Sequence, residues 1–474
     1  IPAPKGKTEK LLINPSTVNA GTLTMWLRPE NWNNESDKAW HFFLTSGNSD
    51  GASIMLYRFP EGETRLLFKK ADGIAAEIRS KVPFAADEWV HLAFSFTSDE
   101  IIGDNTRVSV SYSKMIDELQ IGDKILLCNG LVSLRVIRKT ETDAICTVVN
   151  GGVVSNRKSM SFPNKVLHQK YLSDNDKKDL LFGIENEVDF IACSFVSCKE
   201  DINDVRNFMR ENGGDDIDLI AKIENRAGVD NIEEIITASD GIMVARGDMG
   251  VEIPFEQLPA IQKKLITKCR IIGKRSITAT EMLESMITNP RPTRAEISDV
   301  ANAVYDGTSA IMLSGETAAG KFPVESVRAM SKIAEETEIN IDYKKRFKNT
   351  EFQMKNTIDA ISHSTCGVAI DIEAKAIVVC SLGGGTVRMV SRFRAPIDII
   401  GLTTNERAWR KLALSWAVTP VMSEEFPSTE VLFYHAGNTA KSIYRLAPGD
   451  KIVITGGITN GKSGNTNLIK IHTI

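Results

Sequence analysis

One lysine and two acidic residues carry the clearest potential for chemistry in this sequence. They lie in a single stretch, DLIAKIENRAGVDNIEEIITASDGIMVARGDMGVEIP, in which Lys222 and Glu224 are two positions apart and Asp248 follows later. Carboxylate oxygens are hard ligands that suit Mg²⁺ or Mn²⁺, and a divalent ion can bridge them to a phosphorylated substrate. The alternative is a surface salt bridge among the three side chains.

A β-α-β pattern positions these residues. Two short runs rich in Ile and Val, 218–224 and 241–246, flank a segment with apolar residues at helical spacing. Residues two apart on a strand leave the same face, so Lys222 and Glu224 should point together. Asp248 follows the second strand, and α/β barrels place their chemistry at such carboxyl ends.

The loop around Asp248 also suits an anion. Gly247 and Gly250 bracket the aspartate in a tight loop that opens onto a helix, where backbone N–H groups point outward.

Composition and charge exclude several classes of protein. A length of 474 residues predicts about three domains, and the net charge of −4 does not indicate a nucleic-acid binder. No apolar run approaches the roughly 20 residues of a membrane span, and IPAPKGKTEK lacks the apolar centre of a signal peptide. The seven cysteines form no CxxC pair. We therefore expect free thiols and a cytoplasmic location.

Residues 1–98 differ from the rest of the chain. Short strand-like runs alternate with turns at 22–29, 41–47, 52–59, 64–70, 74–80 and 88–96. The stretches GTLTMWLRPENW and DEWVHLAFSF resemble part of a laminin-G or concanavalin-like jelly roll. The resemblance implies a β-sandwich that binds carbohydrate or another ligand, although Trp26, Phe42 and Trp89 could equally be core residues.

A second resemblance covers about residues 99–474. The stretches AKIENRAGVDN, DGIMVARGDMGVEIP, ITATEMLESMITNPRPTRAE, SDVANAVYDGTSAIMLSGETAAGKFP and GDKIVITGGITNGKSGNTNLIKI resemble pyruvate kinase of the bacterial type. The resemblance implies phosphoryl transfer from phosphoenolpyruvate to ADP, which gives pyruvate and ATP in glycolysis. It also implies a homo-oligomer, a tetramer in most members.

The two resemblances together predict a multi-domain α/β fold. Residues 1–98 would form a partial β-sandwich, 99–164 a β-barrel cap, 165–340 the catalytic portion of a TIM-type (β/α) barrel, and 345–474 a C-terminal α/β domain of the effector type. The barrel portion has five candidate strands, at 189–195, 218–224, 241–246, 276–280 and 309–314. They resemble the fourth to eighth strands of the family barrel, so the barrel would be incomplete, with two unpaired edges.

The family resemblance assigns roles to the central residues. Lys222 matches the catalytic lysine, whose charge would stabilise the transferring phosphoryl group and the enolate oxygen. Glu224 and Asp248 match the two ligands of Mg²⁺ or Mn²⁺. Gly247 and Asp248 would offer backbone N–H groups to the substrate carboxylate.

Three further positions line the same pocket by resemblance. Thr280 matches the threonine near the enol carbon that receives a proton, and it would act through water. Ser194 and Phe195 match an SF motif on an earlier strand. Without the resemblance, Ser194 and Thr280 could be ordinary strand-end residues.

Two Gly-rich loops in the C-terminal domain resemble those that bind a sugar-phosphate effector in many members, and plain turn chemistry is the alternative. The candidate residues are Ser381, Gly384, Thr386, Gly461, Lys462 and Gly464, with Arg388 nearby.

Several departures set this chain apart from the family pattern. Glu281 stands where Gln is usual, Ala227 replaces a polar residue, Arg275 and Ser276 replace a Pro-Val-like pair, and Cys128–Asn129 replaces acidic residues. Residues 1–98 show no counterparts of a phosphate-gripping Arg or of the ligands of K⁺. Activity could therefore be impaired, and the alternative is a non-catalytic relic or fusion protein that binds a phosphorylated ligand or a glycan.

Overall fold

The computed structural model divides into two compact units, Ile1–Ser113 and Lys114–Ile474. It describes the backbone of six strands between residues 20 and 97, and then residues 108–110, 112, 114–155, 158–163, 165, 170–352, 354–457 and 464–474. In this part of the chain, no helix combines the length and the apolar character that crossing a membrane requires.

The first unit contains two antiparallel sheets. Strands β1 (Ala20–Leu27) and β6 (Val90–Thr97) form one, and β2 (His41–Gly47), β3 (Ser53–Arg58), β4 (Thr64–Lys70) and β5 (Gly73–Ser80) form the other in that order. Each of the six predicted runs overlaps one of these strands. The side chains of Trp26, Phe42 and Trp89 lie outside the described residues.

A small antiparallel sheet opens the second unit, after helix α1 (Met115–Glu118). Its order is β10 (Met160–Ser161), β7 (Lys124–Leu127), β8 (Val132–Lys139) and β9 (Ala144–Asn150). The turn between β7 and β8 has three consecutive residues with positive φ, at Cys128 (53°), Asn129 (54°) and Gly130 (84°). Asn and Gly tolerate this left-handed conformation, so the turn forms without the acidic residues of the family pattern.

The next sheet has five parallel strands in sequence order. They are β11 (Phe190–Cys193), β12 (Asp218–Ile223), β13 (Gly241–Ala245), β14 (Arg275–Ala279) and β15 (Ala310–Met312). The helices between and after them are α2 (Asp174–Glu185), α3 (Lys199–Glu211), α4 (Arg226–Asp230), α5 (Ile232–Ala238), α6 (Arg246–Glu252), α7 (Leu258–Ile272), α8 (Arg294–Asp306), α9 (Gly315–Ala318) and α10 (Pro323–Ile339). All five predicted strands are present, each shorter than or offset slightly from its expected range.

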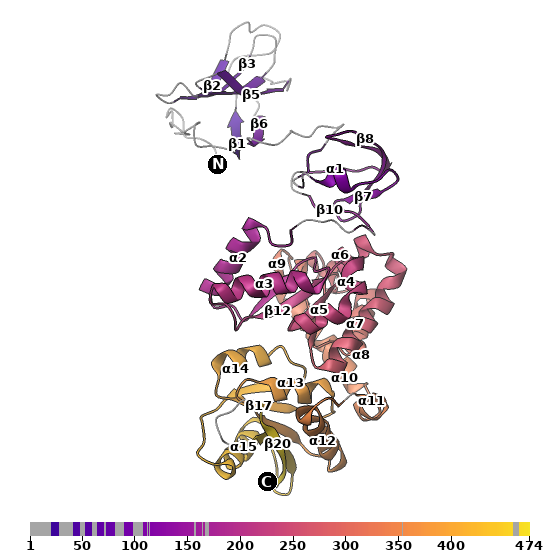
Figure 1. The fold of residues 1–474 in the computed structure, drawn as a ribbon, viewed down its shortest axis with the longest axis vertical. Helices are drawn as coiled ribbons and strands as arrows, with labels where there is room; N and C mark the ends of the chain where they lie inside the picture. Colours follow the sequence, from indigo (N-terminus) through magenta and orange to yellow (C-terminus); the bar gives the residue numbers. More distant parts are fainter. Residues whose placement is uncertain are drawn as a thin grey trace. The chain divides into compact units, whose positions relative to one another are not determined.

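The two faces of this sheet differ, as the alternation of side chains on a strand requires. Leu219, Ala221 and Ile223 of β12 face one way and pack with apolar residues of α3, α5 and α7 (Figure 1). Ile220 faces the other way and packs with residues of β13 and β14. Lys222 therefore shares the face of Ile220, at the carboxyl end of β12.

Both edges of the five-stranded sheet are open within the described part of the chain. Neither β11 nor β15 pairs with a further strand there. An edge strand presents unpaired N–H and C=O groups, which can bind another strand.

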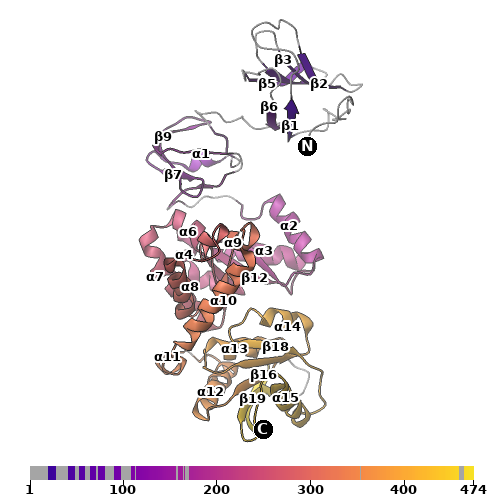
Figure 2. The same ribbon diagram turned by 180° about the vertical axis from the view of Figure 1, so that it is seen from behind.

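The remaining residues form a second α/β layer structure. Its sheet runs β18 (Val418–Met422), β17 (Ile399–Thr403), β16 (Ala376–Cys380), β19 (Lys451–Gly457) and β20 (Thr466–Thr473), with only β20 antiparallel to its neighbour. The helices are α11 (Tyr343–Asn349), α12 (Thr357–Asp371), α13 (Gly385–Arg392), α14 (Glu406–Leu412) and α15 (Thr429–Ile443). Helices α12 and α13 pack on one face and α15 on the other (Figure 2).

Charged residues of α14 join this domain to the five-stranded sheet, and we call these contacts the α14 seam. Arg407 pairs with Asp216, Arg410 with Asp189 at 2.8 Å, and Lys411 with Asp218 at 2.6 Å. All three cations belong to α14 and all three carboxylates lie at or just before the amino ends of β11 and β12.

Candidate active site

Lys222 and Glu224 lie together at the carboxyl end of β12, as their spacing predicts. The Lys222 Nζ is 2.7 Å from Glu224 Oε1 and donates to Ser194 Oγ at 2.9 Å. Glu224 is fully buried, whereas the Lys222 side chain is 23% exposed. The lysine can therefore reach a ligand while it remains anchored by the glutamate.

Glu224 is held in place by the neighbouring loop. Its Oε2 accepts a hydrogen bond of 2.5 Å from the Phe195 backbone N–H, after β11. Burial raises the pKa of Glu224, and the nearby Asp248 side chain acts in the same direction, while the Lys222 ammonium lowers it. The carboxylate is thus more basic than an exposed glutamate and is a strong oxygen ligand for a cation.

The loop after β14 meets the loop after β13. The Gly247 N–H donates to Thr280 Oγ1 at 2.7 Å, and the Thr280 hydroxyl donates to the Ala279 carbonyl at 2.6 Å. Thr280 therefore contacts Gly247, the residue that precedes Asp248. The Gly247 N–H, expected to be open to a substrate, is satisfied by Thr280 in this structure.

Arg246 connects these loops, although no motif in the sequence marks it as a site residue. Its guanidinium binds both carboxylate oxygens of Asp299 at 2.7 and 2.6 Å and donates to the Thr280 carbonyl at 2.7 Å. Nη1 makes both contacts to Asp299 and Nη2 makes the contact to Thr280, so one guanidinium holds two segments in place. The only signal in the sequence was its position one residue before Gly247.

Three residues of these loops have backbone conformations that L-residues rarely adopt. They are Phe195 (φ 53°), Thr280 (φ 68°) and Glu281 (φ 53°). A β-branched residue at positive φ is a genuine outlier, and such strain clusters at functional sites. The departure from the family pattern at Glu281 thus lies within a strained loop, with an exposed carboxylate.

Two more residues hold the loops of the site in place through hydrogen bonds. The Tyr171 hydroxyl donates to the Ser194 carbonyl at 2.7 Å. The buried Glu316 accepts from the N–H groups of Leu283 and Ser314, at 2.9 and 2.8 Å, and so joins the loops after β14 and β15. The bonds from Tyr171 to Ser194 and from Leu283 to Glu316 link segments far apart in the sequence, which is why residue patterns could not reveal them.

The carboxylates of Glu224 and Asp248 suit an ion of the size of Mg²⁺ that takes its remaining ligands from a substrate. Among the described residues, no three acidic, His or Cys side chains gather as a complete metal site. Magnesium characteristically binds through one or two carboxylates together with substrate phosphates. Glu224 Oε1 is buried and has no well-aligned hydrogen-bond donor, and the Asp248 side chain is nearby. The two carboxylates together provide such an incomplete set of ligands.

The Gly-rich loops of the C-terminal domain lie at one end of its sheet. Thr386 and Thr466 are joined by a hydrogen bond of 2.6 Å between their hydroxyls, which brings the start of α13 to the start of β20. Gly384 caps α13 with a φ of 71°, where a side chain would be strained. Ser381 follows β16, and Gly464 precedes β20, whereas Gly461 and Lys462 lie outside the described residues.

Comparison with known families defines the class of protein. A model described as "Pyruvate kinase, barrel domain" matches residues 73–327, and "Pyruvate kinase, alpha/beta domain" matches residues 359–472. A third, "Concanavalin A-like lectin/glucanases superfamily", matches residues 6–109. The barrel-domain match begins earlier than residue 99, and it overlaps the lectin-like match.

Curated relatives agree with the kinase families. Pyruvate kinase of Clostridium acetobutylicum is 46% identical over 377 residues, which cover 79% of this chain and 80% of the relative. Pyruvate kinase of Clostridium perfringens is 44% identical over 428 residues, covering 90% and 86%. That of Staphylococcus epidermidis is 45% identical over 379 residues, covering 79% and 65%. This chain belongs to the pyruvate kinase family, whose members are phosphotransferases.

Proposed function

We propose that this chain transfers the phosphoryl group of phosphoenolpyruvate to ADP, giving pyruvate and ATP. The observation that supports this most directly is the placement of Lys222. Its ammonium lies 2.7 Å from the buried Glu224, with Asp248 following the adjacent strand. A cation and two carboxylates at the carboxyl ends of parallel strands are suited to a phosphorylated, anionic substrate.

Lys222 would stabilise negative charge. Its ammonium lies beside the Glu224 carboxylate, and it can donate to an equatorial oxygen of the transferring phosphoryl group. The same ammonium can then stabilise the oxygen of the enolate. Preorganised charges of this kind typically contribute about 3–4 kcal/mol to the transition state.

Glu224 and Asp248 would hold Mg²⁺ or Mn²⁺. When bound, the ion neutralises charge and orients phosphoryl oxygens. The protein holds the two carboxylates in position through the Phe195 N–H, which binds Glu224 at 2.5 Å, and through the first turn of α6, which carries Asp248.

Thr280 and the loop around Gly247 would orient the substrate and the proton. The hydroxyl of Thr280 lies 2.7 Å from the Gly247 N. Substrate binding would shift this hydroxyl toward a water that protonates the enolate, which would free the Gly247 N–H for the substrate carboxylate. Ser194 and Phe195 would line the same pocket.

The remaining features follow from family membership. We propose an incomplete TIM-type (β/α) barrel with a β-barrel cap, a β-sandwich-like front segment and a C-terminal effector domain for a sugar phosphate. The chain would work in the cytoplasm as a homo-oligomer without nucleic acid or membrane partners. Ligands for K⁺ would have to come from another source than residues 1–98.

The test is a coupled assay of phosphoenolpyruvate plus ADP with Mg²⁺ and K⁺. We expect Lys222→Met to lower kcat by about 10² or more, since a charge made for the transition state is lost. Lys199→Met, which removes an exposed ion pair on α3, should leave kcat unchanged. Equal activity of the wild type and Lys222→Met would contradict the proposal.

The open edges of β11 and β15 favour a second candidate, a non-catalytic relic or fusion protein that binds a phosphorylated ligand or a glycan. This candidate predicts wild-type turnover no greater than that of Lys222→Met, in protein that circular dichroism shows to be folded. Measurable turnover that depends on Lys222 would rule it out.

A further inference from the structure

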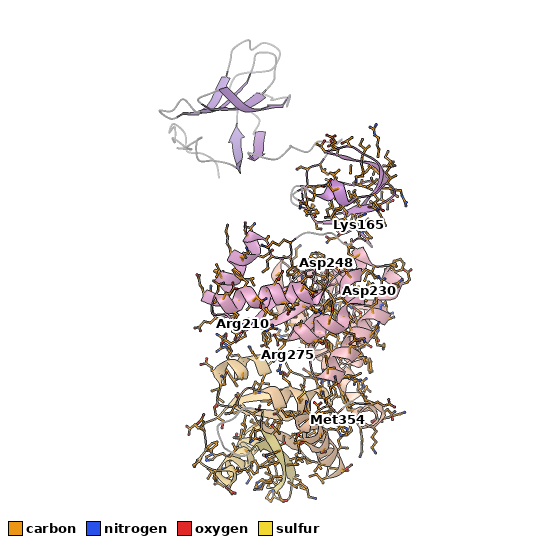
Figure 3. All side chains as sticks on the ribbon, in the orientation of Figure 1. Lys165, Arg210, Asp230, Asp248, Arg275 and Met354 are labelled. Atoms are coloured by element: carbon orange, nitrogen blue, oxygen red, sulfur yellow. The ribbon has the colours of Figure 1, made fainter. Side chains whose placement is uncertain are left out.

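A positively charged cavity lies at the amino end of β14, where the five-stranded sheet meets α13. Its volume is about 270 Å³, including its mouth. Its charged lining residues are all cations: Arg270, Lys274, Arg275, Arg388, Arg392 and Arg394. Figure 3 labels Arg275 and Asp248, which lie at opposite ends of the sheet. The cavity is therefore separate from the proposed active site.

Carboxylates pair with only two of these six cations. Asp218 accepts from Arg275 at 2.7 Å and is shared with Lys411, and Asp359 pairs with Arg392 at 3.0 Å. Asp240 raises the pKa of Lys274 and Glu338 raises that of Arg394, but neither carboxylate forms a direct ion pair with its cation in the described part of the chain.

The other cations bind neutral groups or have no partner. Lys274 donates to the Ser239 carbonyl at 2.5 Å, and Arg394 donates to the carbonyls of Gly307 and Thr308 at 3.1 and 3.4 Å. No hydrogen bond or ion pair joins the Arg388 side chain to another residue in the described ranges, although its backbone N–H donates to the Gly384 carbonyl. Positive charge thus exceeds negative charge around the cavity.

Several guanidinium N–H groups of the lining are buried and unpaired. Arg275, Arg392 and Arg394 are only 4%, 6% and 3% exposed, and the Nε of each has no hydrogen-bond partner within the described part of the chain. A buried donor without a partner is costly, and it is more costly when charged. Three such donors in one lining indicate a missing acceptor.

Burial lowers the pKa of each of these arginines, and like charges add to the effect at Arg275 and Arg394, whereas Asp359 opposes it at Arg392. Arg388 lowers the pKa of Arg275, and Arg270 lowers that of Arg394. The charged state of the cluster is therefore disfavoured in the isolated chain, and an anion within the cavity would stabilise it.

We propose that this cavity binds a phosphate group, either free inorganic phosphate or the phosphate of a small monoester. A tetrahedral dianion offers several acceptor oxygens to converging guanidinium groups, and paired arginine N–H groups match its geometry. The site joins the two domains, because Arg275 belongs to β14 and Arg388 and Arg392 to α13.

Binding is tested by calorimetric titration of the full chain with inorganic phosphate, and separately with methyl phosphate, at constant ionic strength set by NaCl. We expect saturable binding of inorganic phosphate. Arg388→Gln should raise Kd about tenfold or more, since it removes one charge-assisted contact from a side chain that holds no described partner. Arg388→Lys retains the charge and should bind more tightly than Arg388→Gln.

Two controls separate this site from others. Arg445→Gln, at an exposed position of the same domain, should bind phosphate like the wild type. Lys462→Gln alters the Gly-rich loop proposed for the effector and should also retain this binding. Tight methyl phosphate binding would assign the site to monoesters, and its absence would assign it to the free ion.

The proposal is overturned if no saturable binding occurs, or if Arg388→Gln binds phosphate as tightly as the wild type. It is also overturned if only Lys462→Gln weakens binding. None of these readouts depends on turnover, so the proposal and the proposed kinase activity can fail independently.

Discussion

At the scale of single residues, Glu224 is an ionisable side chain in a fully buried position, which is unfavourable in an ordinary hydrophobic core. It is fully buried, and it holds a lysine and a loop N–H through its two oxygens. Burial raises its pKa above the ordinary value of 4.5. Between the unfolded and the folded pKa, the folded state holds the proton that the unfolded state has lost, so stability falls as pH rises through that interval.

Glu224→Gln should therefore separate stability from activity. The amide keeps the size of the side chain and cannot ionise, so its free energy of unfolding should decline less than that of the wild type between pH 4.5 and neutrality. Turnover should fall by about 10²–10³, because a charge needed for catalysis is removed. Denaturant unfolding across this pH range and the coupled assay measure the two effects.

Glu335→Gln provides a matched control at an exposed position of α10. Its unfolding profile and turnover should follow those of the wild type. If Glu224→Gln were less stable than the wild type by the same margin at every pH, the explanation through the glutamate proton would be wrong.

At the scale of secondary-structure elements, Arg246 links β13, the loop after β14, and α8. Replacing it with lysine retains the charge and loses the paired contacts to Asp299 and the Thr280 carbonyl. We expect Arg246→Lys to lower the free energy of unfolding by about 1–3 kcal/mol and kcat by about tenfold or more, through displacement of Thr280.

Arg210→Lys is the comparison, because Arg210 forms an exposed ion pair with Asp215 on the surface. Such pairs contribute about 0–1 kcal/mol, so this variant should unfold and react like the wild type. Chemical unfolding and steady-state kinetics of both variants decide the matter. An Arg246→Lys protein with unchanged kcat would show that the loop holds its position without the guanidinium contacts.

Sequence patterns predicted the parallel strands well because buried strands read as short runs of Ile and Val. Two strands of the C-terminal sheet, β18 and β20, are harder to recognise from sequence for physical reasons. Strand β18 contains Pro420, which is compatible only with an edge position, and β18 is at an edge. Strand β20 is also an edge strand, and it mixes polar residues with Leu468, Ile469 and Ile471.

The candidate site was predictable where its geometry is local. Lys222 and Glu224 meet because they are two residues apart on one strand. The bonds from Arg246 to Thr280 and from Glu316 to Leu283 cross about thirty residues, and no periodicity reports them. The cationic cavity was missed for the same reason, although Arg275 had already stood out as a departure from the family pattern.

At the scale of the whole molecule, we expect the front of the chain to limit the activity of the site. Residues 6–109 match a lectin-like family, while the relative from Clostridium acetobutylicum aligns over only 79% of this chain. Replacing residues 1–98 with the front segment of that relative should raise kcat by about 10² or more, since each restored electrostatic contact contributes about 10²–10³. The coupled assay measures the change.

The matched control carries Lys222→Met in the same chimera. It should lose the gain, since the restored groups act on a substrate that Lys222 binds. Equal turnover of the chimera and the natural chain would show that residues 1–98 already supply what the reaction needs.

The α14 seam has a consequence for how the second unit holds together. Three cations of one short helix face three carboxylates at or just before the amino ends of two strands. Every ion pair of the seam therefore has its cation on α14 and its anion on the five-stranded sheet side. A protease cut in the connection between α10 and α12 should leave two fragments that stay associated in dilute buffer. Concentrated salt, which shortens the Debye length from about 10 Å at 0.1 M to about 3 Å at 1 M, should let them separate.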